Sequence, residues 1–112
     1  MRYTLDETSR ATERGMMMLE VEFAGLVKTV VADYANEHLD KSDNEEITKD
    51  DVYIVWMCKT LQNSKALAST TLLDGMYYEL TYNGDKHELY LDAYKKFENR
   101  CLRFDNNVHY RY

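Results

Sequence analysis

Apolar residues in the first half of the chain recur at the three- and four-residue spacing of an amphipathic helix. Charged residues such as Lys28 and Glu37 fall mostly between them. Because this spacing places apolar side chains on one helix face, it predicts a helix over about residues 18–39. Gly25 inside a helix costs roughly 1 kcal/mol relative to alanine, so we expect it to mark close packing against another backbone. The apolar positions are Val21, Phe23, Leu26, Val27, Val30, Val31 and Tyr34.

The second half of the chain contains shorter apolar and aromatic runs that are typical of β-strands. They cover about residues 52–58, 65–72, 76–82 and 87–91, with turn residues between them. Asn83-Gly84 is the strongest hairpin signal, because both positions accept a positive φ. These runs predict four antiparallel strands paired in chain order. The first is apolar on both faces, with Tyr53, Val55 and Met57 on one and Val52, Ile54 and Trp56 on the other.

Helical signals also flank the predicted strands. Thr48 and Asp51, three residues apart, can cap one short helical turn before the first strand. Asp92 can cap a closing helix whose apolar face packs on the sheet; that face contains Ala93, Tyr94, Phe97, Cys101 and Leu102. The whole order predicts an α+β fold: an N-terminal helix, a four-stranded antiparallel meander and a C-terminal helix, with the helices packed on one face of the sheet.

Length and composition indicate a single folded domain. The chain has 112 residues, of which 45% are hydrophobic and 30% charged, a mixture typical of a globule. We expect residues 18–112 to form the domain and residues 1–17 to be a flexible extension. No stretch approaches the roughly 18 to 20 apolar residues that cross a bilayer, so we expect a cytoplasmic protein without membrane association. Cys58 and Cys101 lack close metal-type spacing, so we expect two reduced, buried thiols.

The negative charge of the chain is concentrated in one segment. Residues 16–51 carry ten acidic and three basic side chains, a net of −7, whereas residues 52–112 carry seven acidic and eight basic ones, a net of +1. An acidic segment can attract a basic partner, although a solvated surface that keeps a small protein soluble has the same composition. The candidate partner-binding residues are Asp40, Asp43, Glu45, Glu46 and Asp50.

Catalytic and metal-binding motifs are not recognisable in the sequence. Cys58 lies in the middle of a predicted strand, no motif surrounds the three histidines, and the four glycines are scattered. Residues 40–51 partly match a calcium-binding loop, but Glu45 replaces the glycine of the sharp turn and Asp51 is shorter than the usual bidentate glutamate. We therefore predict a non-catalytic protein with no metal and no cofactor.

Nucleic-acid binding is the main alternative function. The order of helix, antiparallel meander and helix is similar to that of the double-stranded-RNA-binding domain, whose last helix places lysines on phosphates. A basic stripe on the predicted last helix would contain Lys95, Lys96, Arg100 and Arg103. The domain resembled has three strands, however, and the −7 segment would oppose phosphate approach.

Aromatic residues leave two further possibilities open. Core packing explains most of the ten tyrosines, but tyrosine and tryptophan also anchor interfaces. The sheet could therefore bury its second face in a homodimer. Alternatively, a deep pocket lined by Tyr78, Tyr82 or Trp56 would indicate a small-molecule binder or a hydrolase.

Residues 19–103 resemble an uncharacterised family of small proteins encoded by phages and prophages of Gram-positive bacteria. The most recognisable pieces are residues 51–56, 58–63, 74–79, 82–85 and 91–96. The family has no assigned activity, so the resemblance implies context and no catalytic residue. It implies a phage accessory protein, and our hypothesis is that this protein binds a host protein and inhibits a host defence system, with the acidic segment as its contact surface.

Overall fold

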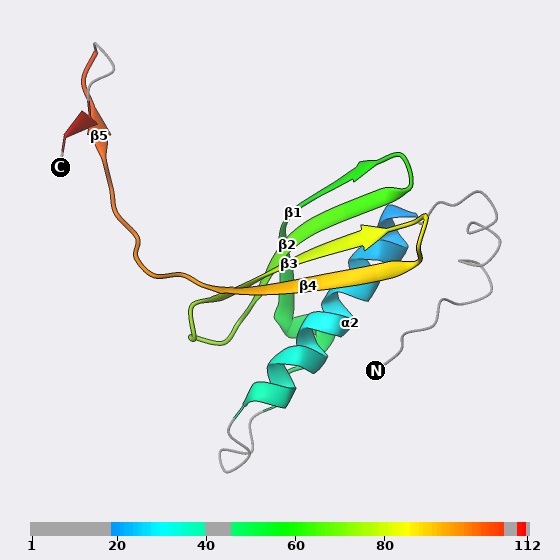
Figure 1. The fold of residues 1–112 in the computed structure, drawn as a ribbon. Coiled ribbons are helices and arrows are strands. Elements are labelled where there is room, and N and C mark those ends of the chain that lie inside the picture. Colours follow the sequence, from blue (N-terminus) through cyan, green and yellow to red (C-terminus); the bar gives the residue numbers. More distant parts are fainter. Residues whose placement is uncertain (1–18, 40–45, 107–109, 112) are drawn as a thin grey trace.

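A helix lies against a four-stranded antiparallel sheet in the computed structural model, which describes residues 19–39, 46–106 and 110–111 (Figure 1). The α+β class, the N-terminal helix and the four-stranded antiparallel sheet are therefore confirmed. The expected flexible extension, residues 1–17, lies outside the described residues. The elements are α2 (Glu20–His38), the short 3-10 helix η2 (Lys49–Asp51), β1 (Val52–Thr60), β2 (Asn63–Thr70), β3 (Met76–Asn83), β4 (Glu88–Lys95), β5 (Arg103–Phe104) and β6 (Tyr110–Arg111).

The four long strands are neighbours in the order β1-β2-β3-β4, as predicted. The turn between β3 and β4 lies where Asn83-Gly84 places it, and Asn83 pairs with Glu88 across it. The Asn83 side-chain oxygen accepts hydrogen bonds from the backbone N–H groups of Asp85 and Lys86, at 3.0 and 3.2 Å. His87, with φ 52°, takes the left-handed conformation in this loop. The asparagine thus stabilises a four-residue turn.

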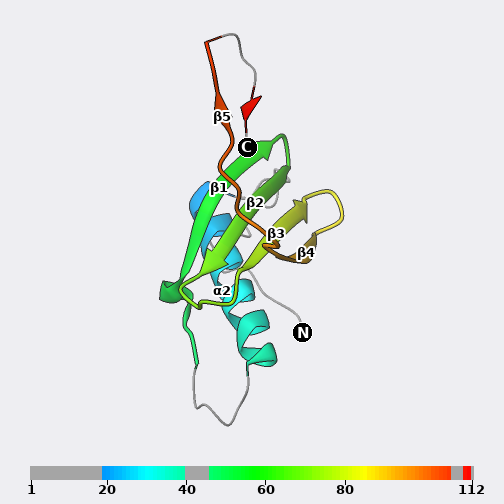
Figure 2. The same cartoon turned by 90° about the vertical axis from the view of Figure 1, so that its left-hand side faces the viewer.

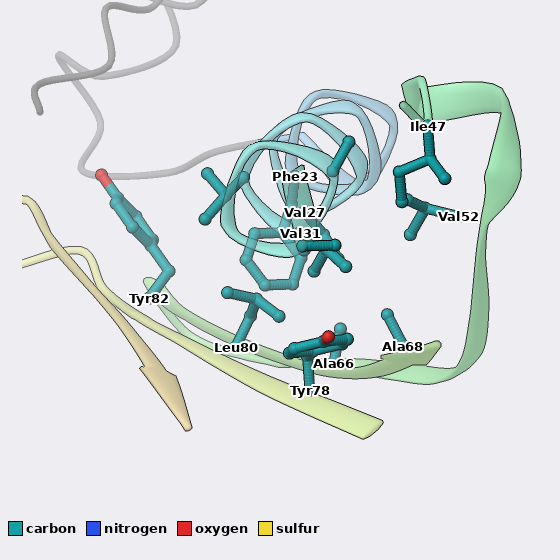
Figure 3. Packing of buried hydrophobic residues seen from close by; sticks show 13 residues of the cluster. Phe23, Val27, Val31, Ile47, Val52, Ala66, Ala68, Tyr78, Leu80 and Tyr82 are labelled. Atoms are coloured by element: carbon teal, nitrogen blue, oxygen red, sulfur yellow. The ribbon is translucent and has the colours of Figure 1, made fainter. Parts of the chain in front are cut away.

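One face of α2 and one face of the sheet form the hydrophobic core (Figure 3). Phe23, Val27 and Val31 of α2 are almost fully buried, as are Ala66 of β2 and Leu80 of β3. The small alanine side chains of β2 let the helix approach the sheet closely. Burying each large apolar side chain contributes about 1.5–3 kcal/mol, so this layer stabilises the contact between the helix and the sheet.

Gly25 does not mark a close approach. It is exposed on α2, and a Cβ added there would meet nothing within 4 Å. The expectation of close backbone packing was therefore wrong. No helix in the described part of the chain is long and apolar enough to span a membrane.

The predicted C-terminal helix is absent from the described residues 92–106. β4 instead continues to Lys95, which pairs with Met76, and the next backbone N–H, of Lys96, donates to the Gly75 carbonyl at 2.7 Å. The extended chain satisfies the backbone groups along the whole outer edge of β3, which a helix beginning at Asp92 would leave unpaired. α2 is the one helix found against this sheet among the described residues, so the prediction of two packed helices was wrong.

A β-bulge at Val55 changes which residues of β1 share a face. The pairing with β2 shifts between Ile54 and Trp56, so that Ile54 opposes Ala68 and Trp56 opposes Leu67. An inserted residue reverses the alternation beyond it, and strict alternation therefore fails in this strand. Ile54 and Met57 pack on the core, while Trp56 lies on the opposite face.

Candidate protein-binding face

The sheet face opposite α2 carries aromatic side chains from three strands. We call this surface the open face and define it by Tyr53, Trp56, Leu67, Tyr77, Tyr90 and Tyr94. The strand register aligns Tyr53, Ser69, Tyr77 and Tyr94 in one row across all four strands. The adjacent row contains Trp56, Leu67, Glu79 and Asp92. Antiparallel pairing thus gathers residues that are 41 positions apart in the sequence, from Tyr53 to Tyr94.

Four of the six residues of the open face are exposed, Leu67 and Tyr77 are half-buried, and no described element covers this face. Tyr53, Trp56, Tyr90 and Tyr94 keep 47%, 42%, 50% and 51% of their surface accessible. By contrast, Tyr78 on the helix side of the same sheet is 2% exposed. A contiguous exposed aromatic surface is typical of interaction sites, because tyrosine and tryptophan bury a large area with few rotatable bonds.

Two acidic residues lie side by side within the open face. Glu79 on β3 is directly opposite Asp92 on β4, and like charges in this arrangement destabilise a sheet. The Lys65 ammonium lies 3.6 Å from the Glu79 carboxylate. Asp92 forms no ion pair with the residues that the structure describes. The aromatic surface therefore has an acidic centre that favours a basic ligand.

At the edge of this face, the Tyr90 hydroxyl donates to the Glu88 carboxylate at 3.0 Å. This hydrogen bond and the negative charge of Glu88 raise the pKa of Tyr90. Tyr90 therefore stays a neutral hydrogen-bond donor across the ordinary pH range.

The structure describes only part of the predicted acidic surface. Glu46, which precedes η2, and Asp50 within η2 are exposed, whereas Asp40, Asp43 and Glu45 lie outside the described residues. The predicted capped turn is confirmed: the Thr48 hydroxyl accepts from the Asp50 N–H at 3.2 Å, and the Asp51 carboxylate accepts from the Thr48 N–H at 2.8 Å. Asp51 thus caps a helical turn. Across the described ranges, no three His, Cys, Asp or Glu side chains lie together as metal ligands would.

The basic residues predicted on the last helix lie instead along extended chain. Lys95 ends β4, and Lys96, Arg100 and Arg103 follow in a segment whose residues are all exposed. Arg100 forms an ion pair with Glu98 at 2.7 Å within this segment. These cations share no helix face, so the likeness to a double-stranded-RNA-binding domain fails at its last element.

The residues suggested to line a pocket lie on both sides of the sheet, and the prediction of buried thiols is wrong. Tyr78 and Tyr82 are buried beneath α2, while Trp56 lies on the open face, so the three side chains occupy opposite sides of the sheet. Cys58 and Cys101 are both free and exposed. Cys58 belongs to an uncovered strand and Cys101 to the chain after β4, so neither reaches the core.

A family model described as a family of unknown function (DUF6275) matches residues 25–104. The chain belongs to this family. The matched residues include every member of the open face and the chain after β4 as far as Phe104. The resemblance to an uncharacterised family is confirmed at this level. No curated protein and no solved structure matches the chain.

Proposed function

We propose that this chain is a non-catalytic protein-binding module and that the open face is its contact surface. The exposed aromatic rows are the observation that carries this proposal. Trp and Tyr are the residues most enriched among interface positions that dominate binding energy. The acidic pair Glu79 and Asp92 adds a preference for a partner segment that combines apolar and basic side chains.

To test this proposal, the tagged chain is used to capture proteins from a nuclease-treated lysate. An untagged copy of the chain is added to the lysate, so that binding of a second copy is also detected. The variant Trp56→Ser with Tyr94→Ser removes two exposed rings of the open face. Leu73→Ser is the matched control, because Leu73 is fully exposed in the loop between β2 and β3. We expect wild type and control to retain a protein, either the second copy or another one, that the face variant loses. Equal retention by the face variant would refute the proposal.

We also propose the biological setting that the resemblance implies. In this setting the chain is a phage accessory protein that acts in the cytoplasm of its host and binds a host protein of a defence system. The acidic segment then provides the contact for a basic host protein. Replacing Asp43, Glu45, Glu46 and Asp50 with their amides should weaken capture of that protein and leave the fold intact. Unchanged capture removes this segment as a contact.

Binding of single-stranded nucleic acid is the second candidate function. It is supported by the continuity of Tyr90 and Tyr94 with the basic residues that follow β4, since bases stack on exposed aromatic rings while cations bind phosphates. Glu79 and Asp92 within the open face oppose it. This candidate predicts binding of a single-stranded oligonucleotide that weakens steeply with salt and is lost on replacing Lys95, Lys96, Arg100 and Arg103.

A further inference from the structure

The chain leaves the sheet after β4 as an extended arm, which we define as residues 96–106. Figure 1 shows it projecting away from the body, and in the view of Figure 2 it passes in front of the sheet and ends above it. Its apolar side chains are exposed: Phe97 by 98%, Phe104 by 62% and Leu102 by 40%. At its end, β5 pairs with β6 and not with the four-stranded sheet. Exposure of two phenylalanines to water is unfavourable, and each would bury a large apolar area if another surface covered the arm.

The arm and the open face have complementary chemistry. The arm carries three basic and two acidic side chains, a net of +1, in a chain whose total is −6. Arg103 lies between Leu102 and Phe104 and forms no ion pair with a described residue. Asp92 on the open face likewise forms no ion pair with a described residue. A segment in which an arginine lies between two apolar side chains therefore matches an aromatic surface with an acidic centre.

We propose that two copies of the chain exchange these arms, so that the arm of each copy lies on the open face of the other. This rests on the proposed function and names the protein that the open face binds. Phe97 and Phe104 then pack on the aromatic rows, and the Arg103 guanidinium pairs with the partner copy's carboxylate at the position of Asp92. Both open faces are covered in one two-fold symmetric dimer.

The direction of the arm favours a second copy over its own sheet. To cover its own open face, the arm would have to turn back sharply directly after β4. Tight reversals favour glycine or proline, and residues 85–112 contain neither. Eleven extended residues reach about 35 Å, whereas four strands are about 19 Å wide. The arm is therefore long enough to cross the sheet of a second copy.

Sedimentation equilibrium of the full chain tests the exchange. We expect a dimer for wild type and for Leu73→Ser, and a dissociation constant raised about 30-fold or more for Phe97→Ser with Phe104→Ser. A chain that stays monomeric at 100 μM (about 1.3 mg/ml) would overturn the exchange, as would a dimer indifferent to the arm variant. If a monomeric chain still captures another protein through the open face, the proposed function stands without the exchange.

Charge reversal tests the pairing itself. Arg103→Glu and Asp92→Arg should each weaken the dimer, and the two changes together should restore it, because the ion pair is then re-formed with its charges exchanged. Lys86→Glu is the matched control, since Lys86 is an exposed cation in the loop between β3 and β4. Failure of the double variant to associate better than either single variant would overturn the Arg103–Asp92 pairing.

The two exposed cysteines distinguish exchange from folding back within one chain. Cys58 lies on β1 and Cys101 in the arm. A mixture of Cys58→Ser and Cys101→Ser chains, treated with a bifunctional maleimide, should give a dimeric band on a denaturing gel. That band should exceed the one formed by either variant alone. A wild-type band that remains monomeric while both thiols of one chain become linked would show folding back and refute the exchange.

Discussion

Gly84 and Gly25 have opposite surroundings within one small chain. A Cβ on Gly84 would collide with the backbone carbonyl of Gln62, in the turn between β1 and β2, whereas a Cβ on Gly25 would meet nothing. The Gly84 N–H also donates to the Asn63 side-chain oxygen at 3.2 Å, and the Gln62 amide donates to Asp85 at 2.7 Å. Gly84 therefore allows two hairpin turns to lie against each other.

We predict opposite effects from alanine at these two positions. Gly84→Ala should lower the free energy of unfolding by about 1–3 kcal/mol, because a backbone group cannot move aside as a flexible side chain would. Gly25→Ala should raise it by about 0.5–1 kcal/mol, because alanine is the better residue inside an exposed helix. Urea unfolding of both variants measures this. Two changes of the same sign would contradict the assigned packing.

Tyr78 gives the stability of the fold a dependence on alkaline pH. Burial, followed by the nearby Asp74 and Tyr34, raises the pKa of its hydroxyl above the usual value of 10.0. Because this pKa is higher in the folded than in the unfolded state, the protonated Tyr78 hydroxyl contributes its full stabilisation below about pH 10. This stabilisation is lost as the pH rises through the folded-state pKa. The ring also contacts Tyr34 edge-to-face at 5.6 Å, so ionisation would place a charge within the core.

We therefore predict that Tyr78→Phe reduces the loss of stability between pH 8 and pH 11. The free energy of unfolding, measured in urea at both values, should fall less for this variant than for wild type. Tyr53→Phe removes a hydroxyl from an exposed ring and should leave the wild-type difference unchanged. Equal losses in all three proteins would show that Tyr78 does not control this dependence.

Among the elements, the Asn36 side chain of α2 forms two hydrogen bonds with the chain leading into β1. The Asn36 amide donates to the Ile47 carbonyl at 2.8 Å, and its oxygen accepts from the Ile47 N–H at 2.9 Å. Both bonds are partly buried, and Ile47 itself belongs to the core. Asn36 thus positions η2 and the start of β1 against the helix. Its helical spacing carries no signal for this role, because the partner lies eleven residues away beyond a charged connector.

We predict that Asn36→Ala lowers the free energy of unfolding by about 1–3 kcal/mol, since it leaves a buried backbone donor and acceptor without partners. Thr29→Ala is the control on the same helix, because the Thr29 hydroxyl bonds only the Gly25 carbonyl within the helix. Its effect should stay within about 0.5 kcal/mol. Chemical denaturation compares the two, and indistinguishable midpoints would exclude the anchoring role.

Local pattern predicted the elements wherever it agreed with the long-range pairing. The helix expected over 18–39 is α2, and all four strands lie in the predicted order. The pattern failed after Asp92, where spacing typical of a helix competes with an unpaired edge of β3. Tertiary pairing decides such cases, and β4 gains its hydrogen bonds only if Tyr94 and Lys95 remain extended.

The candidate site was predictable in residue type but not in geometry. Ten tyrosines indicated an interface, yet the alternation placed Tyr53 and Trp56 on opposite faces. The bulge at Val55 brings them to one face, and a single extra residue in a uniformly apolar strand leaves no signature in the sequence. The sequence did not predict the exposed arm, because its residues, like the end of β4, were assigned to a C-terminal helix.

Taken as a whole molecule, the chain separates a packed body from an exposed arm. Its radius of gyration is 17.4 Å, whereas a compact domain of about 100 residues has one of about 13 Å. The buried residues run from Phe23 to Tyr82, and every described residue from 92 to 106 is exposed. The body should therefore fold without the arm.

The last prediction concerns how stability depends on protein concentration. If arms are exchanged, dilution favours the monomer, so the melting temperature of wild type should rise by about 3 °C or more for each tenfold increase in concentration. A chain truncated after Lys96 keeps the bond to Gly75 and should melt cooperatively at one temperature at all concentrations. A chain truncated after Asp92 also lacks the residues that pair with Tyr78 and Met76. Its melting temperature should be lower at every concentration. Calorimetry over a hundredfold range of concentration separates these cases, and a wild-type melting temperature independent of concentration would leave the arm no role in stability.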